Sequence, residues 1–308
     1  MKLKIFLLIG LLGIPIAYSE ACDICGCGAG NSYIGILPDF NQNIAGLRYR
    51  YNSVLTHIGA NGENTYLTTD ERYQIAEIWG GVTLAKRFRA MGTLPYSFNT
   101  KIQQSNRIEK NGLGDASLWT YYQALNQSRS LFKTKLMVQS LWIGAGTKLP
   151  TGHYTDNASL TVSDANLFQL GTGSMDFMIG GMYDLRLQDA GISLNANYKM
   201  NTSNRSAYRY GNKLSGSAQL YYKFNIRNRF TLSPNAGVVY EQSGIDTRDR
   251  RRVLTSGGSI LLAGFGLEGM IGRQAVWGAG FHIPVKQHLA SGIVQANNRM
   301  MVHIGWMF

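Results

Sequence analysis

Three cysteines are the residues of this 308-residue chain best suited to bind a soft metal ion, and they lie within six positions, at Cys22, Cys25 and Cys27. The glycines around them let the three thiols converge without backbone strain. Three thiolates form a donor set for Cu(I) or Zn(II). Two other interpretations stay open: one disulfide plus a free thiol, as an oxidising compartment favours, and a lipid attached to Cys22.

The segment before these cysteines has the layout of a secretory signal. Lys2 and Lys4 precede an apolar run over residues 5–16, and Ser19 and Ala21 then give a small-x-small cleavage site. The apolar run is too short for a membrane anchor. We therefore predict a signal peptide over residues 1–21, followed by a periplasmic segment rich in Cys and Gly over residues 22–42.

Charged residues recur on one face of extended segments after residue 40, where apolar side chains repeat with period two. In an extended chain, alternate side chains point to opposite faces, so one face of each segment is apolar and the other polar. The polar faces predict a set of interior residues that contact a solute: Arg48, Arg50, Arg89, Asp115, Asp176, Lys199, Lys223, Glu241 and Glu268. Mixed charge of this kind can select solutes or form ion pairs that close the interior.

About twelve segments share this alternation, and each is long enough to cross a bilayer as a strand. They are residues 43–54, 71–85, 87–101, 113–126, 133–148, 168–185, 190–202, 212–225, 229–242, 257–270, 274–285 and 297–308. The connections between them alternate between tight turns and long loops; residues 102–112 and 149–167 are two of the long ones. This pattern predicts an all-β fold, a transmembrane antiparallel up-and-down β-barrel of about twelve strands over residues 43–308, with short periplasmic turns and long outer loops.

Closure of the barrel follows from the solvent. In hydrocarbon every backbone N–H and C=O needs a partner within the protein, so a sheet is stable there only without a free edge. The alternative is a soluble sandwich, but its outer face would not alternate apolar residues over so many segments.

The last segment ends the chain on an aromatic residue. Met300, Val302, Ile304, Trp306 and Phe308 alternate with polar or small residues. Trp306 and Phe308 resemble the C-terminal assembly signal that outer-membrane proteins present to the barrel-assembly machinery. We expect both residues at the periplasmic aromatic girdle.

Composition excludes other classes. With 16% charged residues and a mean hydropathy of −0.13, the chain fits neither an average soluble domain nor a helical membrane protein. The net charge of +12 comes from scattered basic residues apart from Arg248 and Arg250 to Arg252. An exported protein rarely meets nucleic acid, so we expect lipopolysaccharide phosphates and anionic solutes as the partners of this charge.

Three glycine-containing stretches together resemble a known family. They run from Gly112 to Asp115 (GLGD), from Gly144 to Gly152 (GAGTKLPTG) and from Leu170 to Asp176 (LGTGSMD). In order and spacing they are similar to the outer-membrane family named for the meta pathway of phenol degradation, over roughly residues 40–308. The resemblance implies a barrel and a transport role, but it does not imply phenol as the substrate.

Three functions are compatible with these features. The leading one is an outer-membrane channel or transporter for small solutes, including hydrophobic, aromatic or metal-linked ones. The second is a metal-binding protein in which the barrel anchors the cysteine head. The third is a barrel hydrolase, but there is no nucleophile elbow and no local Ser/His/Asp grouping, so we predict that the chain is not an enzyme. His282 and His303 are expected to form hydrogen bonds inside the barrel.

Overall fold

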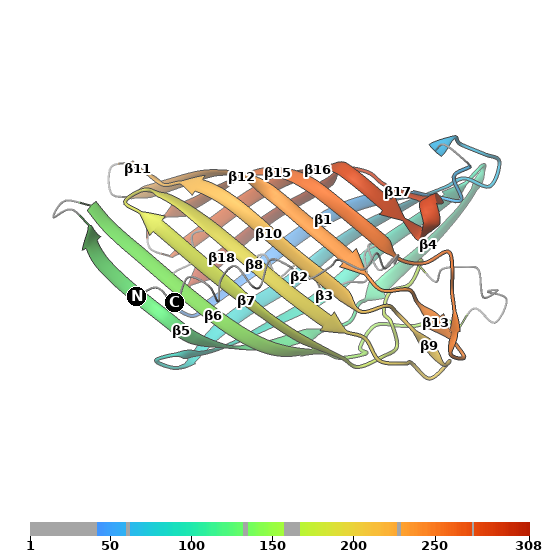
Figure 1. Cartoon of the computed structure of the whole chain (residues 1–308), viewed down its shortest axis with the longest axis horizontal. Helices are drawn as coiled ribbons and strands as arrows, with labels where there is room; N and C mark the ends of the chain where they lie inside the picture. The colour runs from blue at the N-terminus through green and yellow to red at the C-terminus, as the bar shows by residue number, and fades with distance from the viewer. Residues whose placement is uncertain (1–41, 60–61, 132–134, 157–166, 227–228, 273) are drawn as a thin grey trace, which may run out of the picture.

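Twelve antiparallel strands form the wall of a closed barrel in the part of the chain that the computed structural model describes, residues 42–59, 62–131, 135–156, 167–226, 229–272 and 274–308 (Figure 1). They are β1 (Ile44–Thr56), β2 (Thr69–Ala85), β3 (Phe88–Gln103), β5 (Ser117–Leu131), β6 (Lys135–Lys148), β7 (Asp176–Leu187), β8 (Ala190–Met200), β10 (Lys213–Tyr222), β12 (Phe230–Ser243), β15 (Gly258–Ile271), β16 (Ala275–Leu289) and β18 (Arg299–Met307). The last strand, β18, pairs with both β16 and β1, which closes the sheet. The predicted fold class is therefore confirmed. Among the described residues, no helix is long and apolar enough to cross a membrane.

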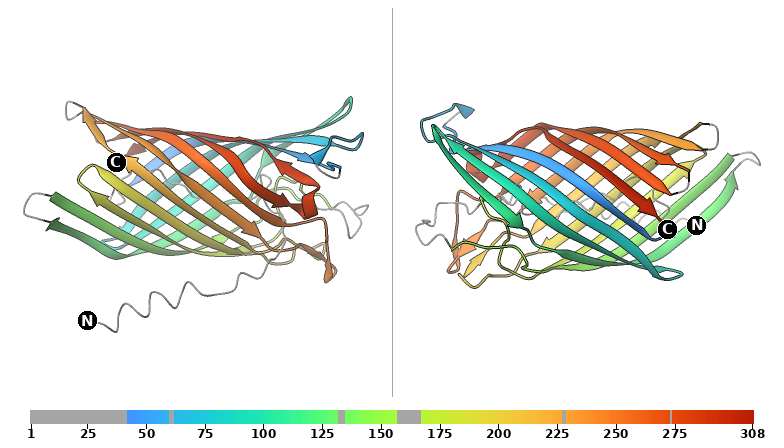
Figure 2. Two further views of the ribbon diagram at one scale, coloured as in Figure 1. Left: turned by 45° about the horizontal axis from the view of Figure 1, so that its top comes forward. Right: turned by 180° about the vertical axis from the view of Figure 1, so that it is seen from behind.

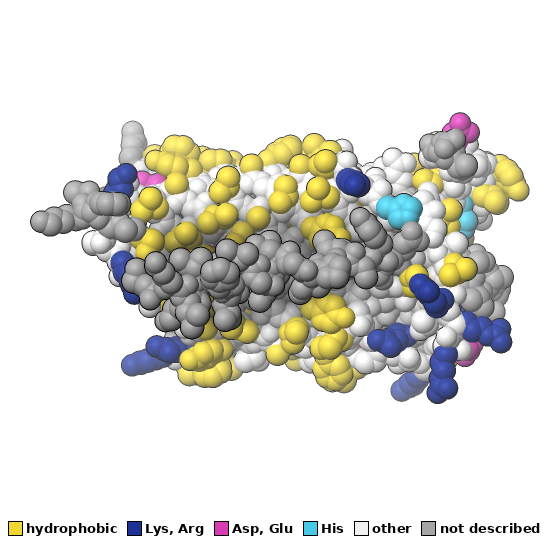
Figure 3. All heavy atoms as spheres, in the orientation of Figure 1, with side chains coloured by type: hydrophobic (Ala, Val, Ile, Leu, Met, Phe, Trp, Pro, Cys, Tyr) yellow, Lys and Arg dark blue, Asp and Glu magenta, His cyan; other side chains and the backbone are white. Residues whose placement is uncertain are grey.

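Alternation along each strand separates an inner face from an outer one. In β2, Tyr73, Glu77 and Trp79 are buried, whereas Ile78 between the last two is 61% exposed. On the face seen in Figure 3, hydrophobic side chains are spread over the visible wall between the two ends of the barrel, whereas charged side chains gather at the ends. This distribution matches a wall whose outer face contacts lipid.

Tight turns lie at one end of the barrel and long connections at the other (Figures 1 and 2). Gln188 and Gly272 have positive φ values of 56° and 64° in two of the tight turns. The start of β1 and the C-terminus lie at the tight-turn end, where Phe308 N donates to Asn43 O at 2.9 Å. The predicted alternation of short and long connections is confirmed.

The long connections carry short strands that the sequence did not predict. β4 (Asn106–Leu113) pairs with β3 and extends it as a hairpin beyond the wall. The predicted loop over residues 102–112 is therefore wrong, because Gln104 turns the chain with a positive φ of 52° and the two arms then pair. β17 (Val294–Ala296) pairs with β1 and β16 after a 3₁₀ turn at Ala290–Gly292. At the tight-turn end, β11 (Phe224–Ile226) continues the segment of β10 and pairs with β12.

A second, small sheet lies at the loop end of the barrel. It consists of β9 (Tyr208–Arg209), β13 (Thr247–Arg248) and β14 (Arg251–Arg252). Tyr208, Tyr210 and Val253 are buried beneath it, and Tyr208 Oη donates to buried Asp246 at 2.6 Å. These contacts hold the two loops together.

The predicted strand over residues 168–185 is wrong at its start, because β7 begins only at Asp176. Residues 167–175, which we call the inner strap, instead fold against the inside of the wall. Gly171 allows a close approach there, since a Cβ on it would lie 2.5 Å from Asp115 Oδ1, and Gly173 has a positive φ of 70°. Leu, Gly, Thr, Gly and Ser alternate in this segment as residues of a strand do. Its two glycines, however, are needed because the backbone bends and approaches the wall closely.

Candidate functional site

The interior of the barrel carries a row of charged side chains from neighbouring strands. Arg48 lies opposite Glu77 on one side and His303 on the other, and Gly278 lies between His303 and Glu268. Arg48 Nε contacts Glu77 Oε2 at 2.5 Å, and Arg50 Nη2 contacts Glu77 Oε1 at 2.5 Å. His303 Nε2 lies 3.2 Å from Glu268 Oε2. We call Arg48, Glu77, His303 and Glu268 the charged row.

A glycine makes the contact between His303 and Glu268 geometrically possible. These residues are on β18 and β15, with β16 between them. A Cβ on Gly278 would lie 2.4 Å from His303 Cε1 and 2.6 Å from Glu268 Oε2. The two side chains therefore meet directly over the Gly278 backbone.

A second ionic contact lies nearer the loop end. Glu241 contacts Arg299 Nη1 at 3.0 Å and Lys213 Nζ at 3.4 Å; Glu241 and Lys213 are buried, and Arg299 is mostly buried. Buried charges are tolerated only when they are paired, so the interior is an arrangement of opposite charges.

Aromatic side chains lie on the tight-turn side of the charged row. Trp79, Trp119, Tyr121 and Trp142, which we call the aromatic layer, are buried together with several methionines, including Met91 and Met178. Trp119 and Tyr121 stack at a centroid distance of 5.4 Å and an interplanar angle of 9°. The Arg48 guanidinium lies 6.0 Å from the Trp79 ring centre, so the charged row and the aromatic layer are in contact.

The space between the two layers is small. A cavity of about 10 Å³ is bounded by Arg48, Trp79, Met91, Trp119 and Tyr121, together with Gly92 and Thr93. This is about the volume that one water molecule needs. The side chains of the two layers therefore pack closely around this point.

The three family-like stretches meet at a buried lysine. Lys148 Nζ contacts Asp115 Oδ2 at 2.6 Å, Asp176 Oδ2 at 2.9 Å and Ser174 O at 3.0 Å, and it also donates to Thr172 Oγ1. Lys148 and Asp176 are both fully buried. We call these five residues the lysine cluster.

Further hydrogen bonds fasten the inner strap to the wall. Asn99 Nδ2 donates to Gln169 O at 3.2 Å, and Lys110 Nζ donates to Phe168 O at 2.9 Å. Asn204 Nδ2 donates to Thr172 O at 3.0 Å. The strap therefore lines the inside of the barrel at the loop end.

The structure places most of the predicted interior residues inside the barrel. Arg48, Arg89, Asp115, Asp176, Lys199, Glu241 and Glu268 are buried, and Arg50 is partly buried. Lys223 is partly buried at the tight-turn end, where its backbone N–H donates to Asp189 O at 2.7 Å and its Nζ lies 5.5 Å from the ring centre of buried Tyr221. Whether any of these residues contacts a solute stays a prediction.

Other interior residues were missed by the sequence analysis. Glu77, Lys213 and Arg299 complete the ion pairs, and each stands at a polar position of an alternating segment, so the same signal could have identified them. Lys148 stands within a family-like stretch, but the stretch alone does not show that its side chain meets Asp115 and Asp176. The alternation of polar and apolar residues did not identify the aromatic layer, because inward aromatic residues cannot be distinguished in the sequence from the apolar residues of the outer face.

Of the two predicted sites near the chain ends, only the C-terminal assembly signal lies within the described residues. Trp306 and Phe308 are exposed on the outer face at the tight-turn end, at 54% and 67%. Cys22, Cys25 and Cys27 lie outside the described residues. Within those residues, there is no group of three or more His, Cys, Asp or Glu side chains that could hold a metal ion.

The structure is similar to solved outer-membrane proteins. An outer membrane channel from Pseudomonas putida F1 superposes with a TM-score of 0.61 at 13% identity, covering 91% of this chain and all of that one. The transport unit of the autotransporter AIDA-I from Escherichia coli gives a TM-score of 0.45 at 11% identity, with 91% and 94% of the two chains covered. No protein-family model matches the chain, and no curated protein sequence matches it either. The likeness therefore supports the fold, and membership of the phenol-pathway family stays a prediction.

Proposed function

We propose that this protein is an outer-membrane channel for small solutes. The proposal rests on one observation: a closed barrel with an apolar outer face encloses a charged row that directly contacts an aromatic layer. A purely structural interior could be filled with apolar side chains at less desolvation cost, so buried charge in the middle of a barrel favours a path for polar groups. The similarity to an outer membrane channel supports the same function.

The two layers favour a particular class of solute. The charged row offers both a carboxylate and a guanidinium to polar groups, and the aromatic layer offers ring faces to an apolar or aromatic body. A small amphipathic solute with an aromatic or apolar part and one polar or charged end satisfies both layers.

The orientation follows from the connections. We place the tight turns in the periplasm and the long loops outside the cell, with residues 1–21 as a cleaved signal peptide and residues 22–42 as a periplasmic segment. Trp306 and Phe308 would then engage the assembly machinery from the periplasmic side, where their exposed rings lie.

Single-channel conductance in planar bilayers tests the channel function. Trp119→Ala removes an indole from the aromatic layer and should raise the conductance about twofold or more, because the space beside Arg48 becomes larger. Phe265→Ala is the matched control, since Phe265 is an aromatic residue on the outer face, and its conductance should equal that of the unchanged protein. If folded Trp119→Ala protein gives no conductance, the interior is not a solute path.

A further inference from the structure

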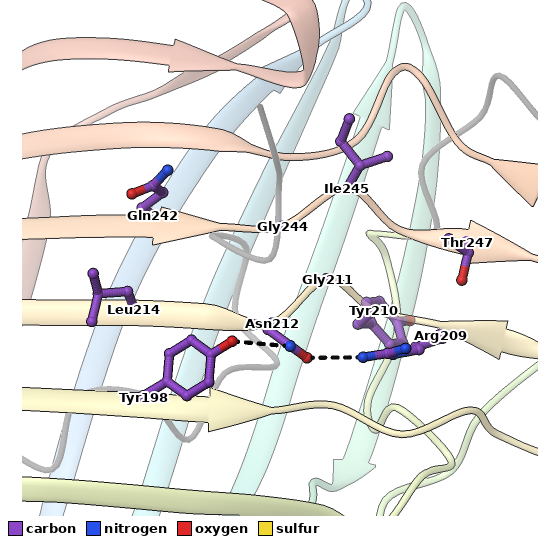
Figure 4. A pocket seen from close by; sticks show the side chains of 10 residues that line it. All are labelled: Tyr198, Arg209, Tyr210, Gly211, Asn212, Leu214, Gln242, Gly244, Ile245 and Thr247. Atoms are coloured by element: carbon purple, nitrogen blue, oxygen red, sulfur yellow. Dashed lines mark hydrogen bonds between the residues drawn. The ribbon is translucent and has the colours of Figure 1, made fainter. Parts of the chain in front are cut away.

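A pocket lies on the outer face of the wall, where β8, β10 and β12 reach the loop end (Figure 4). Its volume is about 460 Å³. Tyr198, Leu214 and Gln242 lie opposite one another on these three strands and form its lower side. Arg209, Asn212 and Thr247 form much of its upper side.

Burial shows that this pocket faces away from the interior. Leu214 is 43% exposed, whereas its chain neighbours Lys213 and Ser215 are buried inside the barrel. The outward positions below the pocket on β10 and β12 are apolar or small, including Leu220 and Val238. The pocket therefore lies at the boundary between the apolar band of the wall and the polar loops, at the depth of lipid headgroups in the outer leaflet.

Two glycines shape the back of the pocket. A Cβ on Gly211 would lie 1.6 Å from Gly244 O, and Gly244 N donates to Asn212 O at 2.6 Å. No other residue type allows the two chains to approach so closely. The backbone conformation of the two loops therefore forms the back of the pocket.

Polar groups converge on the pocket. Asn212 Nδ2 donates to Tyr198 Oη at 3.1 Å, and Arg209 Nη2 lies 3.4 Å from Asn212 Oδ1 (Figure 4). Arg209 Nε also donates to Asn201 O at 3.0 Å, which orients the guanidinium. The exposed Arg209 has five N–H donors, and these contacts use two of them.

A second arginine lies on the same side of the small sheet. Thr247 is opposite Arg209 on β9 and opposite Arg252 on β14, so the three side chains share one face. Arg251 belongs to the neighbouring row with Arg248 and Tyr208, which faces the other way. Lys and Arg side chains gather at this corner of the barrel (Figure 3).

We propose that this pocket binds the phosphorylated headgroup of an outer-leaflet glycolipid, as in lipopolysaccharide. The Arg209 and Arg252 guanidiniums would hold a phosphate, for which the planar fork of arginine is well suited. Asn212, Gln242 and Tyr198 offer hydrogen bonds to sugar hydroxyls, and the acyl chains would lie along the apolar wall below Leu214. An occupant of this kind matches the positive charge of Arg209 in the pocket and of Arg252 beside it, and also the depth of the pocket in the membrane.

Binding of purified bisphosphorylated lipid A to the full detergent-solubilised protein, followed by native mass spectrometry, tests the proposal. Arg252→Gln should weaken binding about tenfold, the loss expected for one charge-assisted contact to phosphate. Arg251→Gln is the matched control, because it removes the same charge from the adjacent position on the opposite face, and it should change binding less than about twofold. Thr247→Asp provides a second variant, because a carboxylate between the two arginines should abolish the preference for phosphorylated over dephosphorylated lipid A.

Three outcomes would overturn the proposal. Equal losses in Arg252→Gln and Arg251→Gln would show only a general charge effect. Equal binding of dephosphorylated lipid A would show that phosphate is not recognised. Complete displacement of the lipid by millimolar inorganic phosphate would show a site for a free anion instead of a lipid.

Discussion

The charged row and the lysine cluster are both buried and ionic, but they are built in different ways. Every residue of the charged row stands on a regular wall strand, and backbone pairing fixes which residues face each other. The lysine cluster joins the ends of β6 and β7 to residues 115, 172 and 174, which lie outside the strands. The first arrangement forms when the barrel closes, whereas the second requires the inner strap to fold back into the barrel.

This difference determines what each ionic site can stabilise. Loss of an ion pair in the charged row leaves buried charges, but the strands on either side are still held by their backbone hydrogen bonds. Loss of the lysine would leave two carboxylates buried beside each other and would also remove two hydrogen bonds to the strap, at Thr172 and Ser174. We therefore expect the lysine cluster to be the more sensitive of the two sites.

Lys148→Met should have the largest effect. It leaves Asp115 and Asp176 without their shared cation, and we expect a loss of about 3–5 kcal/mol in the free energy of unfolding, because uncompensated buried charge is costly. Urea unfolding of the protein refolded in detergent measures the loss. The strap should also become accessible to protease.

The matched control neutralises the carboxylates as well. In the triple variant Lys148→Met, Asp115→Asn and Asp176→Asn, no charge is left within the lysine cluster, so at least half of the lost stability should return. If the single variant unfolds at the same urea concentration as the unchanged protein, the lysine cluster does not fasten the strap.

The strands and the inner faces of the barrel could be predicted from the sequence, because period-two alternation is a local signal. Arg48 and Glu241 stand at positions where the alternation alone shows the inner face. The inner strap could not be predicted in this way. Its path depends on a hydrogen bond between Asn99 and residue 169, which are far apart in the sequence. Its two glycines are also two positions apart, which is the period of side chains on one face of a strand.

The partners of the predicted charges also needed the structure. Which acid meets Arg48 depends on the register between β1 and β2, and a shift of one residue would bring Ile78 opposite it instead of Glu77. The aromatic layer depends on glycines of neighbouring strands: a Cβ on Gly46 would lie 3.0 Å from the Trp79 ring, and one on Gly146 would lie 2.8 Å from the Trp119 ring. Such pairs across strands are not visible in one segment alone.

Glu77→Gln tests the charged row and should have an intermediate effect. Arg48 and Arg50 each donate to one carboxylate oxygen, but the amide has one oxygen and its NH₂ group faces the other arginine. We expect a loss of about 2–3 kcal/mol, measured by the same urea unfolding. Glu109→Gln breaks an exposed pair with Arg107 and should cost less than about 1 kcal/mol. Equal losses in the two variants would show that burial of the row has no energetic consequence.

Gly278→Ala should have the smallest effect of the three, and it tests whether the row depends on space rather than on charge. The new methyl group would meet His303 and Glu268 at 2.4 and 2.6 Å, so the two side chains must move apart, at a cost of about 1–2 kcal/mol.

Gly280→Ala adds the same methyl group two residues further along β16, where the nearest atoms lie 3.8 Å away. Because alanine restricts the unfolded chain more than glycine does, this control should be neutral or stabilising by up to about 1 kcal/mol. A loss in Gly280→Ala as large as that in Gly278→Ala would mean that any methyl group on this strand disturbs the barrel. The space over Gly278 would then have no special part in joining His303 to Glu268.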